Sequence, residues 1–308
     1  MTQSDGLPAP GRPLAGGARR APRRPHLSAR TRVGVAATGF LLPAVALLVV
    51  LRVVPLVRAG SDAFTSRSGA LTLTVFENLF GDPDFLNTLK VTLLFSLIVN
   101  PFQIGLALLL AVVLVQHIPL VGVWRALILL PIAIPQTVSA IVWGVLMRPD
   151  GPLNAILGAV GIEPVPWLIS PDLALFSIVI VASWVGVGYW MTFLVAGIKD
   201  IPPSLFEAAE LDGATGVQRF FRITLPSIRR QLLFVLVADS VANFLLFVPV
   251  RILTRGGPQG STNTIMNNIF ERAYLFGNYP SAAAATLVLI VIVIAVVGLQ
   301  FRLLPGRE

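Results

Sequence analysis

The chain has 308 residues, of which 55% are hydrophobic and 12% are charged, and its mean hydropathy is +0.82. A soluble protein of this size would need more charged residues on its surface. The composition therefore indicates a membrane protein and excludes an ordinary soluble domain. The net charge of +8 does not indicate nucleic-acid binding, because the basic residues are distributed by membrane side. With no cysteine in the sequence, we expect no thiolate metal site, and we predict no metal ion or cofactor in this chain.

The first segment, residues 1–32, is rich in Pro, Gly, Ala and Arg and has no apolar period. We expect it to be a disordered, basic cytoplasmic tail. Its arginines favour retention of the N-terminus in the cytoplasm, and an electrostatic anchor to anionic lipid headgroups is the alternative.

Six apolar runs follow, each long enough to supply the roughly 20 helical residues that cross a bilayer. They predict an all-α, polytopic protein with one membrane domain over residues 33–301 and a cytoplasmic tail over residues 302–308. With the N-terminus inside, fifteen Lys and Arg residues fall on the cytoplasmic side and seven outside, which places both termini in the cytoplasm. The predicted spans are Val33 to Val57, Val91 to Val115, Ala126 to Met147, Leu173 to Ile198, Leu232 to Val250 and Ala282 to Phe301.

The second and third spans contain prolines within the apolar run. Pro101 predicts a kink in the second span, because proline removes a backbone hydrogen bond and crowds the preceding turn. The third span contains Pro131 and Pro135, and Gln136 follows them, so one side of it is polar. Broken, partly polar helices commonly line a substrate pathway, whereas ordinary helix packing is an equal alternative.

The fifth span contains the only acidic residue within a predicted span, Asp239, with Asn243 four positions later on the same helix face. An Asp at the bilayer centre disfavours insertion by roughly 2.5 to 3.5 kcal/mol, so a buried partner or a water-filled cavity is implied. Asp239 therefore lies either at a solute path or in an interhelical contact, such as an ion pair with Arg52, Arg251 or a partner chain.

Aromatic and amide side chains in the spans suit a polar solute, since rings stack on sugars and amides hydrogen-bond to hydroxyls. The alternative is that the aromatic residues pack between helices or lie at the membrane interface. The predicted solute-path residues are Gln136, Trp184, Tyr189, Asp239, Asn243 and Phe244.

The segment over residues 199–231 is too polar to span a membrane and carries helix signals. Pro202 and Pro203 open a short helix, Gly213 ends it, and a second short helix is expected from Thr215 to Arg222. Such a pair of helices can insert a small apolar face into a groove on a soluble partner, and a solvated connector is the alternative.

This segment resembles the cytoplasmic coupling loop of ABC-importer permeases, which reads Glu-Ala-Ala, three residues, Gly, nine residues and Ile-x-Leu-Pro. From about Phe40 to Phe301 the chain is similar to the carbohydrate-uptake type, like the first membrane subunit of maltose and glycerol-3-phosphate importers. It departs from that type at Arg255, where a third glycine is usual. The resemblance assigns ATPase coupling to Glu207, Ala208, Ala209, Asp212, Gly213, Ala214, Ile223, Leu225 and Pro226.

The resemblance implies a type I ABC-importer permease fold in a bacterial cytoplasmic (inner) membrane. It also implies a second homologous permease, two ATP-binding subunits and an extracytoplasmic solute-binding protein as partners. Neither Lys90 nor Lys199 lies in a phosphate-binding loop pattern, so we expect a non-catalytic chain, with ATP and Mg²⁺ held by the ATPase.

The implied solute is a sugar or oligosaccharide, and glycerol-3-phosphate or another polyol is the alternative within the same architecture. From the residues alone, a secondary transporter is a more distant alternative, because such proteins usually carry several intramembrane charges and often an internal repeat. A membrane enzyme would need convergent titratable groups, and the spans supply one acid.

Overall fold

The computed structural model describes residues 29–65, 70–116 and 118–303, with side chains from residue 37 onward. Most of the predicted disordered tail, residues 1–28, and residues 304–308 of the predicted C-terminal tail lie outside the described residues. The first predicted span begins earlier than expected, because α1 (Ala29–Leu48) already starts four residues before Val33. The chain forms two units, Met1–Pro55 and Leu56–Glu308.

The described residues form helices joined by loops, with one isolated β-bridge between Thr65 and Leu71. A π-helical turn η1 (Val49–Val53) follows α1 in the first unit, and α2 (Val54–Ala63) continues into the second. The long helices of the second unit are α4 (Pro83–Val115), α8 (Pro171–Lys199), α12 (Arg229–Phe244) and α15 (Tyr279–Leu303). The short ones are α3 (Thr74–Phe80), α5 (Val121–Leu129), η2 (Leu130–Ala133), α6 (Gln136–Leu146), α7 (Pro152–Ala159), α9 (Pro203–Leu211), α10 (Gly216–Arg219), η3 (Phe220–Thr224), α11 (Leu225–Ser227), α13 (Val248–Leu253), α14 (Ile265–Phe270) and η4 (Glu271–Leu275).

Five helical stretches within the described residues are long and apolar enough to cross a membrane, and a bent pair makes a sixth. Each predicted span therefore has a helical counterpart, and the prediction of an all-α polytopic protein is confirmed. The five stretches are Ala37–Ala63, Pro83–Val115, Pro171–Lys199, Arg229–Leu253 and Tyr279–Leu303.

The third predicted span, Ala126 to Met147, is not one straight helix. The segment Val121–Ala133 meets α6 at an angle of 101°. Ile134 and Pro135 between them have ψ angles of 127° and 134°, which are outside the helical region. A proline disfavours helical backbone at the preceding residue and supplies no N–H of its own, so the chain breaks at this position.

By contrast, Pro101 does not interrupt α4, which is helical over 33 residues. The helix begins where the Asp82 side chain accepts a hydrogen bond from the backbone N–H of Asp84 at 3.0 Å, with Pro83 at the first helical position. α4 then packs along α8, and the small side chains of Ala107 and Ala111 are buried between them.

Two glycines of α8 allow its neighbours to approach closely. A Cβ at Gly186 would lie 2.7 Å from Oε1 of Gln103 on α4, and one at Gly188 would lie 2.3 Å from the backbone oxygen of Ile128 on α5. Both distances are shorter than normal contacts. A side chain at Gly188 would push α5 away because it would meet backbone, whereas one at Gly186 would displace the end of the Gln103 side chain. Small residues of this kind are common where membrane helices pack closely.

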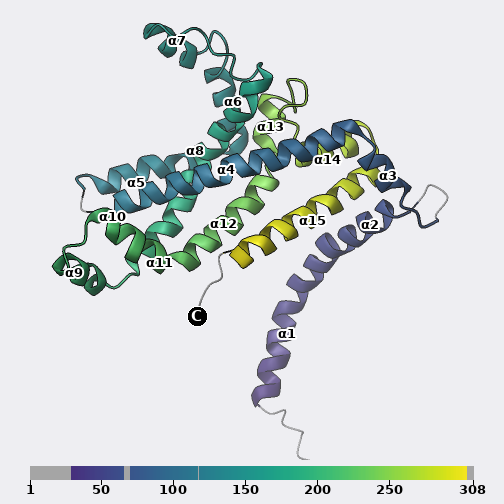
Figure 1. Cartoon of the computed structure of the whole chain (residues 1–308). Helices are drawn as coiled ribbons and strands as arrows, with labels where there is room; N and C mark the ends of the chain where they lie inside the picture. The colour runs from purple at the N-terminus through teal and green to yellow at the C-terminus, as the bar shows by residue number, and fades with distance from the viewer. Residues whose placement is uncertain (1–28, 66–69, 117, 304–308) are drawn as a thin grey trace, which may run out of the picture. The chain divides into compact units, whose positions relative to one another are not determined.

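Within the second unit, α9, α10 and α11 lie together at one end, whereas α3 and α14 lie at the opposite end (Figure 1). α4 and α15 run between these ends, so the predicted coupling loop is separated from the loops around α3 and α14 by the length of a span. The loop after α13 contains Arg255, which adopts a φ of 52°. Glycine favours this left-handed backbone. The glycine that is usual at this position in the family therefore has a physical reason, although this chain has Arg255 there.

Candidate functional site

A cavity of about 350 Å³ lies between α4, α6, α8 and α12. Its wall combines amide, hydroxyl, carboxyl and aromatic groups with short apolar side chains, and the described residues that line it include no Lys, Arg or His. A polar solute would therefore meet hydrogen-bonding groups and rings here. The lining residues are Gln103, Gln136, Ser139, Val181, Ala182, Val185, Gly186, Tyr189, Trp190, Asp239, Ala242, Asn243, Leu246 and Pro249.

Asp239 supplies the acidic group of this wall, and only 1% of its surface is exposed. The Trp190 Nε1–H donates to Oδ1 of Asp239 at 2.5 Å, and Nδ2 of Asn243 donates to the same oxygen at 3.1 Å. The other oxygen, Oδ2, accepts no hydrogen bond from any described residue. The ion pair that the sequence allowed with Arg251 is not formed, because Arg251 contacts Oε1 of Glu271 at 3.1 Å.

A network of buried amides and hydroxyls continues from Asn243 toward α4 and α15. Nδ2 of Asn243 donates to Oδ1 of Asn100 at 2.7 Å and to Oε1 of Gln103 at 3.3 Å. Nδ2 of Asn100 donates to Oγ of Ser240 at 3.0 Å, and Nε2 of Gln300 donates to the same hydroxyl at 2.7 Å. These bonds join three helices and fix the polar wall in place, since each would leave a polar group unsatisfied if broken.

The predicted coupling loop contains the two short helices that its sequence signals indicated. α9 begins at Pro203, and Gly213 ends it with a φ of 72°. The N–H of Gly213 donates to the Glu210 carbonyl, and the N–H of Ala214 donates to the Ala209 carbonyl at 2.9 Å. This is the Schellman arrangement, which requires a left-handed residue at the position of Gly213.

The helix that follows, α10, starts with a capping box. The backbone N–H of Gln218 donates to Oγ1 of Thr215 at 3.3 Å, and the Thr215 N–H donates to Oε1 of Gln218 at 2.8 Å. These reciprocal bonds satisfy two N–H groups that would otherwise lack partners at the helix start. The sequence of the loop therefore specifies two rigid helices with a defined turn rather than a loose connector.

The nine predicted coupling residues do not share one environment. Four of them are half-buried, and one of these, Ile223, packs against the apolar core between α4 and α8. Further apolar side chains that the prediction did not include are strongly exposed on this loop: Leu211, Val217 and Phe221. The exposed coupling residues are Glu207, Ala208, Asp212, Gly213 and Pro226, and the half-buried ones are Ala209, Ala214, Ile223 and Leu225.

Residues 34–307 match the family described as "Binding-protein-dependent transport system inner membrane component". The chain belongs to this family of ABC-importer permeases. The permease is thus a multi-pass, non-catalytic subunit of the inner membrane, and ATP is handled by a partner ATPase. Membership in this family excludes the secondary transporter and the membrane enzyme that the residues alone had left open.

The names of relatives of the permease refer to different solutes. The sn-glycerol-3-phosphate transport system permease protein UgpA of Agrobacterium fabrum is 36% identical over 248 residues, which cover 80% of this chain and 84% of UgpA. The lactose transport system permease protein LacF of Rhizobium radiobacter is 32% identical over 279 residues, covering 87% and 94% of the two chains.

A solved structure has the same fold as the permease. A chain of the bacterial alginate ABC transporter, crystallised in complex with an alginate pentasaccharide-bound periplasmic protein, matches with a TM-score of 0.81 and 22% identity. The match covers 89% of the permease and 95% of that chain, so the predicted permease fold is confirmed.

The structure brings four of the six predicted solute-path residues to the cavity, namely Gln136, Tyr189, Asp239 and Asn243. The other two lie elsewhere. Phe244 is buried in an apolar core with Phe85 and Ile265, and Trp184 lines a separate apolar groove, where its ring packs edge-on against Trp143 at 5.8 Å. Other polar or aromatic side chains of the cavity wall lie outside the predicted set of six, among them Gln103, Ser139 and Trp190.

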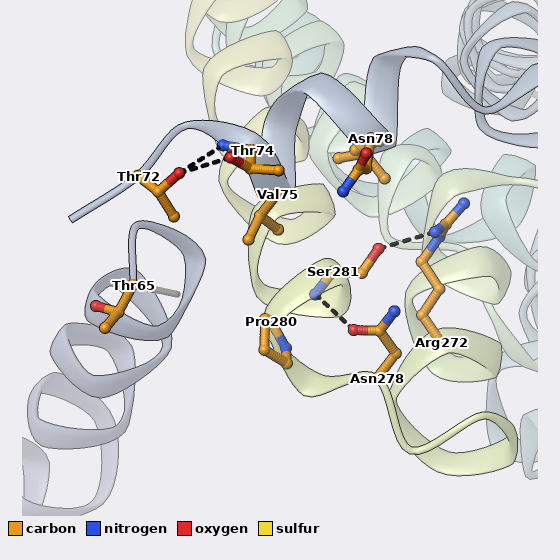
Figure 2. Close-up of a pocket in the computed structure, with 10 residues that line it drawn as sticks. Thr65, Thr72, Thr74, Val75, Asn78, Arg272, Asn278, Pro280 and Ser281 are labelled. Atoms are coloured by element: carbon orange, nitrogen blue, oxygen red, sulfur yellow. Dashed lines mark hydrogen bonds between the residues drawn. The ribbon is translucent and has the colours of Figure 1, made fainter. Parts of the chain in front are cut away.

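A second cavity of the permease, of about 460 Å³, lies beside α3, η4 and the start of α15. Figure 2 shows its lining, in which Arg272 donates to Oγ of Ser281, while Thr72, just before α3, and Thr74, at its start, lie on the opposite wall. The Arg272 guanidinium also contacts Asp82 at 2.5 Å and Oδ1 of Asn268 at 2.6 Å. The Arg272 charge is therefore used in an ion pair with Asp82 that links η4 to the start of α4, and we call this ion pair the clamp.

The clamp shifts the titration of Asp82, which lies just outside the span that begins at Pro83. Burial acts to raise the pKa of Asp82, but hydrogen bonds from Arg272 and from two backbone N–H groups, together with the Arg272 charge, outweigh it. The pKa of this carboxyl is therefore lowered from its usual value of 3.8. Asp82 is therefore ionised at neutral pH and can keep its ion pair with Arg272.

Proposed function

We propose that this permease forms one half of the translocation pathway of an importer for a sugar or oligosaccharide, and that the solute passes through the cavity beside Asp239. The observation that carries the proposal is the composition of the cavity wall. Amide groups of Gln103, Gln136 and Asn243 and the ring of Tyr189 surround a space that a sugar ring can enter. Hydroxyl-rich solutes need several hydrogen-bond partners and an aromatic face, and this wall offers both.

The assembly we propose consists of this permease, a second homologous permease, two ATP-binding subunits and an extracytoplasmic solute-binding protein in a lipid bilayer. The exposed part of the 199–231 loop docks into an ATP-binding subunit, and Leu211, Val217 and Phe221 add apolar surface to that contact. Both termini then lie in the cytoplasm, as the distribution of basic residues favours. Closure of the ATPases moves the loop. The helices on either side of the cavity then rock, so that the cavity opens alternately to the two faces of the membrane.

Glycerol-3-phosphate or another polyol is the second candidate solute, and it is favoured by the 36% identity to UgpA. The two candidates share the architecture and the coupling loop. They differ in charge, because glycerol-3-phosphate needs cationic or N–H donors for its phosphate, whereas a neutral sugar needs donors and acceptors in balance.

The proposal is tested by mild purification of the tagged permease from its native membrane and mass-spectrometric identification of the copurifying chains. We expect an ATPase and a second permease, and the solute-binding protein identified with them supplies the ligand for an uptake assay. Tyr189→Ala should then reduce ATP-dependent uptake of that ligand. Trp184→Ala is the matched control, since it removes an aromatic side chain of the same helix outside the cavity.

Two results would contradict the proposal. One is a permease that stays alone in several mild detergents while its membranes still take up sugar. The other is an uptake rate that falls equally for Tyr189→Ala and Trp184→Ala at equal membrane abundance, because the solute would then not be passing along the cavity wall.

A further inference from the structure

We infer that Asp239 gives the cavity a charge preference, so that it accepts neutral or cationic polyhydroxy solutes and rejects anionic ones such as sugar phosphates. The inference rests on the proposed function, because it concerns a solute in the same cavity. It goes further by choosing between the two candidate classes of solute.

The hydrogen bonds of Asp239 leave one oxygen for a solute. Trp190 and Asn243 both donate to Oδ1, so this oxygen is satisfied within the permease. Oδ2 is a buried acceptor without a partner among the described residues, although unpartnered buried polar atoms are unusual and costly. Oδ2 is itself covered in this conformation, so a solute hydroxyl or ammonium group donates to it and removes that cost only when the cavity wall opens, whereas an ionised phosphate or carboxylate oxygen can only accept.

No positive charge offsets the acid. The described lining residues include no basic side chain, and Arg251, the nearest arginine along the chain on the outer side of α12, is bound to Glu271 and stacks over Phe270 at 5.0 Å. The dielectric constant is low at such a site, so the field of a buried carboxylate acts on a solute even without direct contact.

The test uses a cysteine placed in the cavity wall. The permease has no cysteine of its own, and Ala242 lines the cavity with an exposed side chain on the same helix as Asp239. In the importer complex carrying Ala242→Cys, the rate of maleimide labelling is measured against rising concentrations of glucose, glucosamine and glucose 6-phosphate. The cysteine-free permease in the same complex reports the labelling of partner chains and is subtracted.

We expect glucose and glucosamine to slow the labelling, and glucose 6-phosphate to need a concentration at least about tenfold higher for half protection. Adding Asp239→Asn to the same background should reduce that ratio to about threefold or less, because the amide keeps an oxygen for Trp190 and Asn243 but removes the charge. Asp172→Asn is the control, since it makes the same change in charge at the start of α8, 18 residues or roughly 27 Å along the helix from Trp190.

The outcomes separate the inference from the proposed function. If all three solutes protect Ala242→Cys equally, the cavity carries solute but the charge preference is wrong, as it would be if the second permease supplied a cation. The same conclusion follows if Asp172→Asn changes the ratio as much as Asp239→Asn. If no solute protects the cysteine in a complex that transports its solute, the cavity is not the path, and the proposed site fails together with the inference.

Discussion

The turn at Gly213 allows the mechanics of the coupling loop to be tested with three substitutions at one position. The residue has a φ of 72°, and a Cβ built there would meet no atom within 4 Å. A substitution at this position is therefore limited by the backbone conformation and not by steric clashes. An alanine in left-handed backbone costs about 1 to 2 kcal/mol, which corresponds to a five- to thirtyfold loss in the population of this turn. Asparagine and aspartate tolerate this conformation better.

We therefore expect Gly213→Asn to retain most of the ATP-dependent uptake and Gly213→Ala to reduce it by about five- to thirtyfold. Gly213→Asp should abolish it, because its carboxylate adds a fourth acid to an exposed surface that already carries Glu207, Glu210 and Asp212. Uptake into membrane vesicles is compared at equal permease abundance, and copurification of the ATPase reports docking directly. Normal uptake by Gly213→Asp at normal abundance would refute the coupling assignment, and equal losses in the Asn and Asp variants would refute the role of charge.

Three further predictions test the packing and the clamp. Gly188→Val should lower stability by about 1 to 3 kcal/mol or more, because its Cβ would meet an α5 backbone oxygen at 2.3 Å; a melting temperature in detergent equal to that of the wild type would contradict this close approach. Asp82→Asn should lower the melting temperature at neutral pH, and its difference from the wild type should begin to shrink below a pH of about 4 and vanish once the pH is below the lowered folded-state pKa, because the carboxyl stabilises the fold only while it is ionised. A pH-independent difference would exclude the ion pair with Arg272 as its cause. Phe244→Ala should cost about 3 kcal/mol or more in stability, whereas Tyr189→Ala, with a side chain that is 43% exposed, should leave the melting temperature nearly unchanged; the reverse order would place Phe244 at the path.

Much of the fold follows from features that act locally along the chain. Apolar runs of bilayer length specify the spans, and proline and glycine signals specify α9 and its end. The bend at Pro135 is stronger than its sequence indicated. A proline at Pro101 leaves α4 continuous, whereas the pair Ile134-Pro135 turns the chain by 101°, because an extended residue precedes that proline. Sequence alone does not tell which of two prolines a helix will accommodate.

The structure brings four of the six predicted solute-path residues to the cavity, and helix periodicity explains why the other two lie elsewhere. Asp239 and Asn243 are four positions apart, about 40° around the helix, and both face the cavity. Phe244 lies about 140° around the helix from Asp239, and Trp184 lies about 140° from Tyr189, so both aromatic side chains point away from the cavity face. The angles between side chains around a helix follow from the sequence. Which side of α8 faces the cavity depends on how α8 packs against α4 and α12.

The hydrogen bonds that join Asn100, Ser240 and Gln300 imply which side of the cavity moves. They cross from α4 to α12 and from α12 to α15 away from bulk water, where an amide that loses its partner finds no substitute. These three helices should therefore travel as one body during the transport cycle. In the bent pair, α5 is linked to α4 by the Arg125 guanidinium, which donates to the Leu114 carbonyl at 2.6 Å, whereas α6 makes no such side-chain hydrogen bond among the described contacts and carries Gln136 and Ser139 on the facing wall. The cavity would then open when α6 moves away from the body formed by α4, α12 and α15. The hinge of this movement is the extended pair Ile134-Pro135.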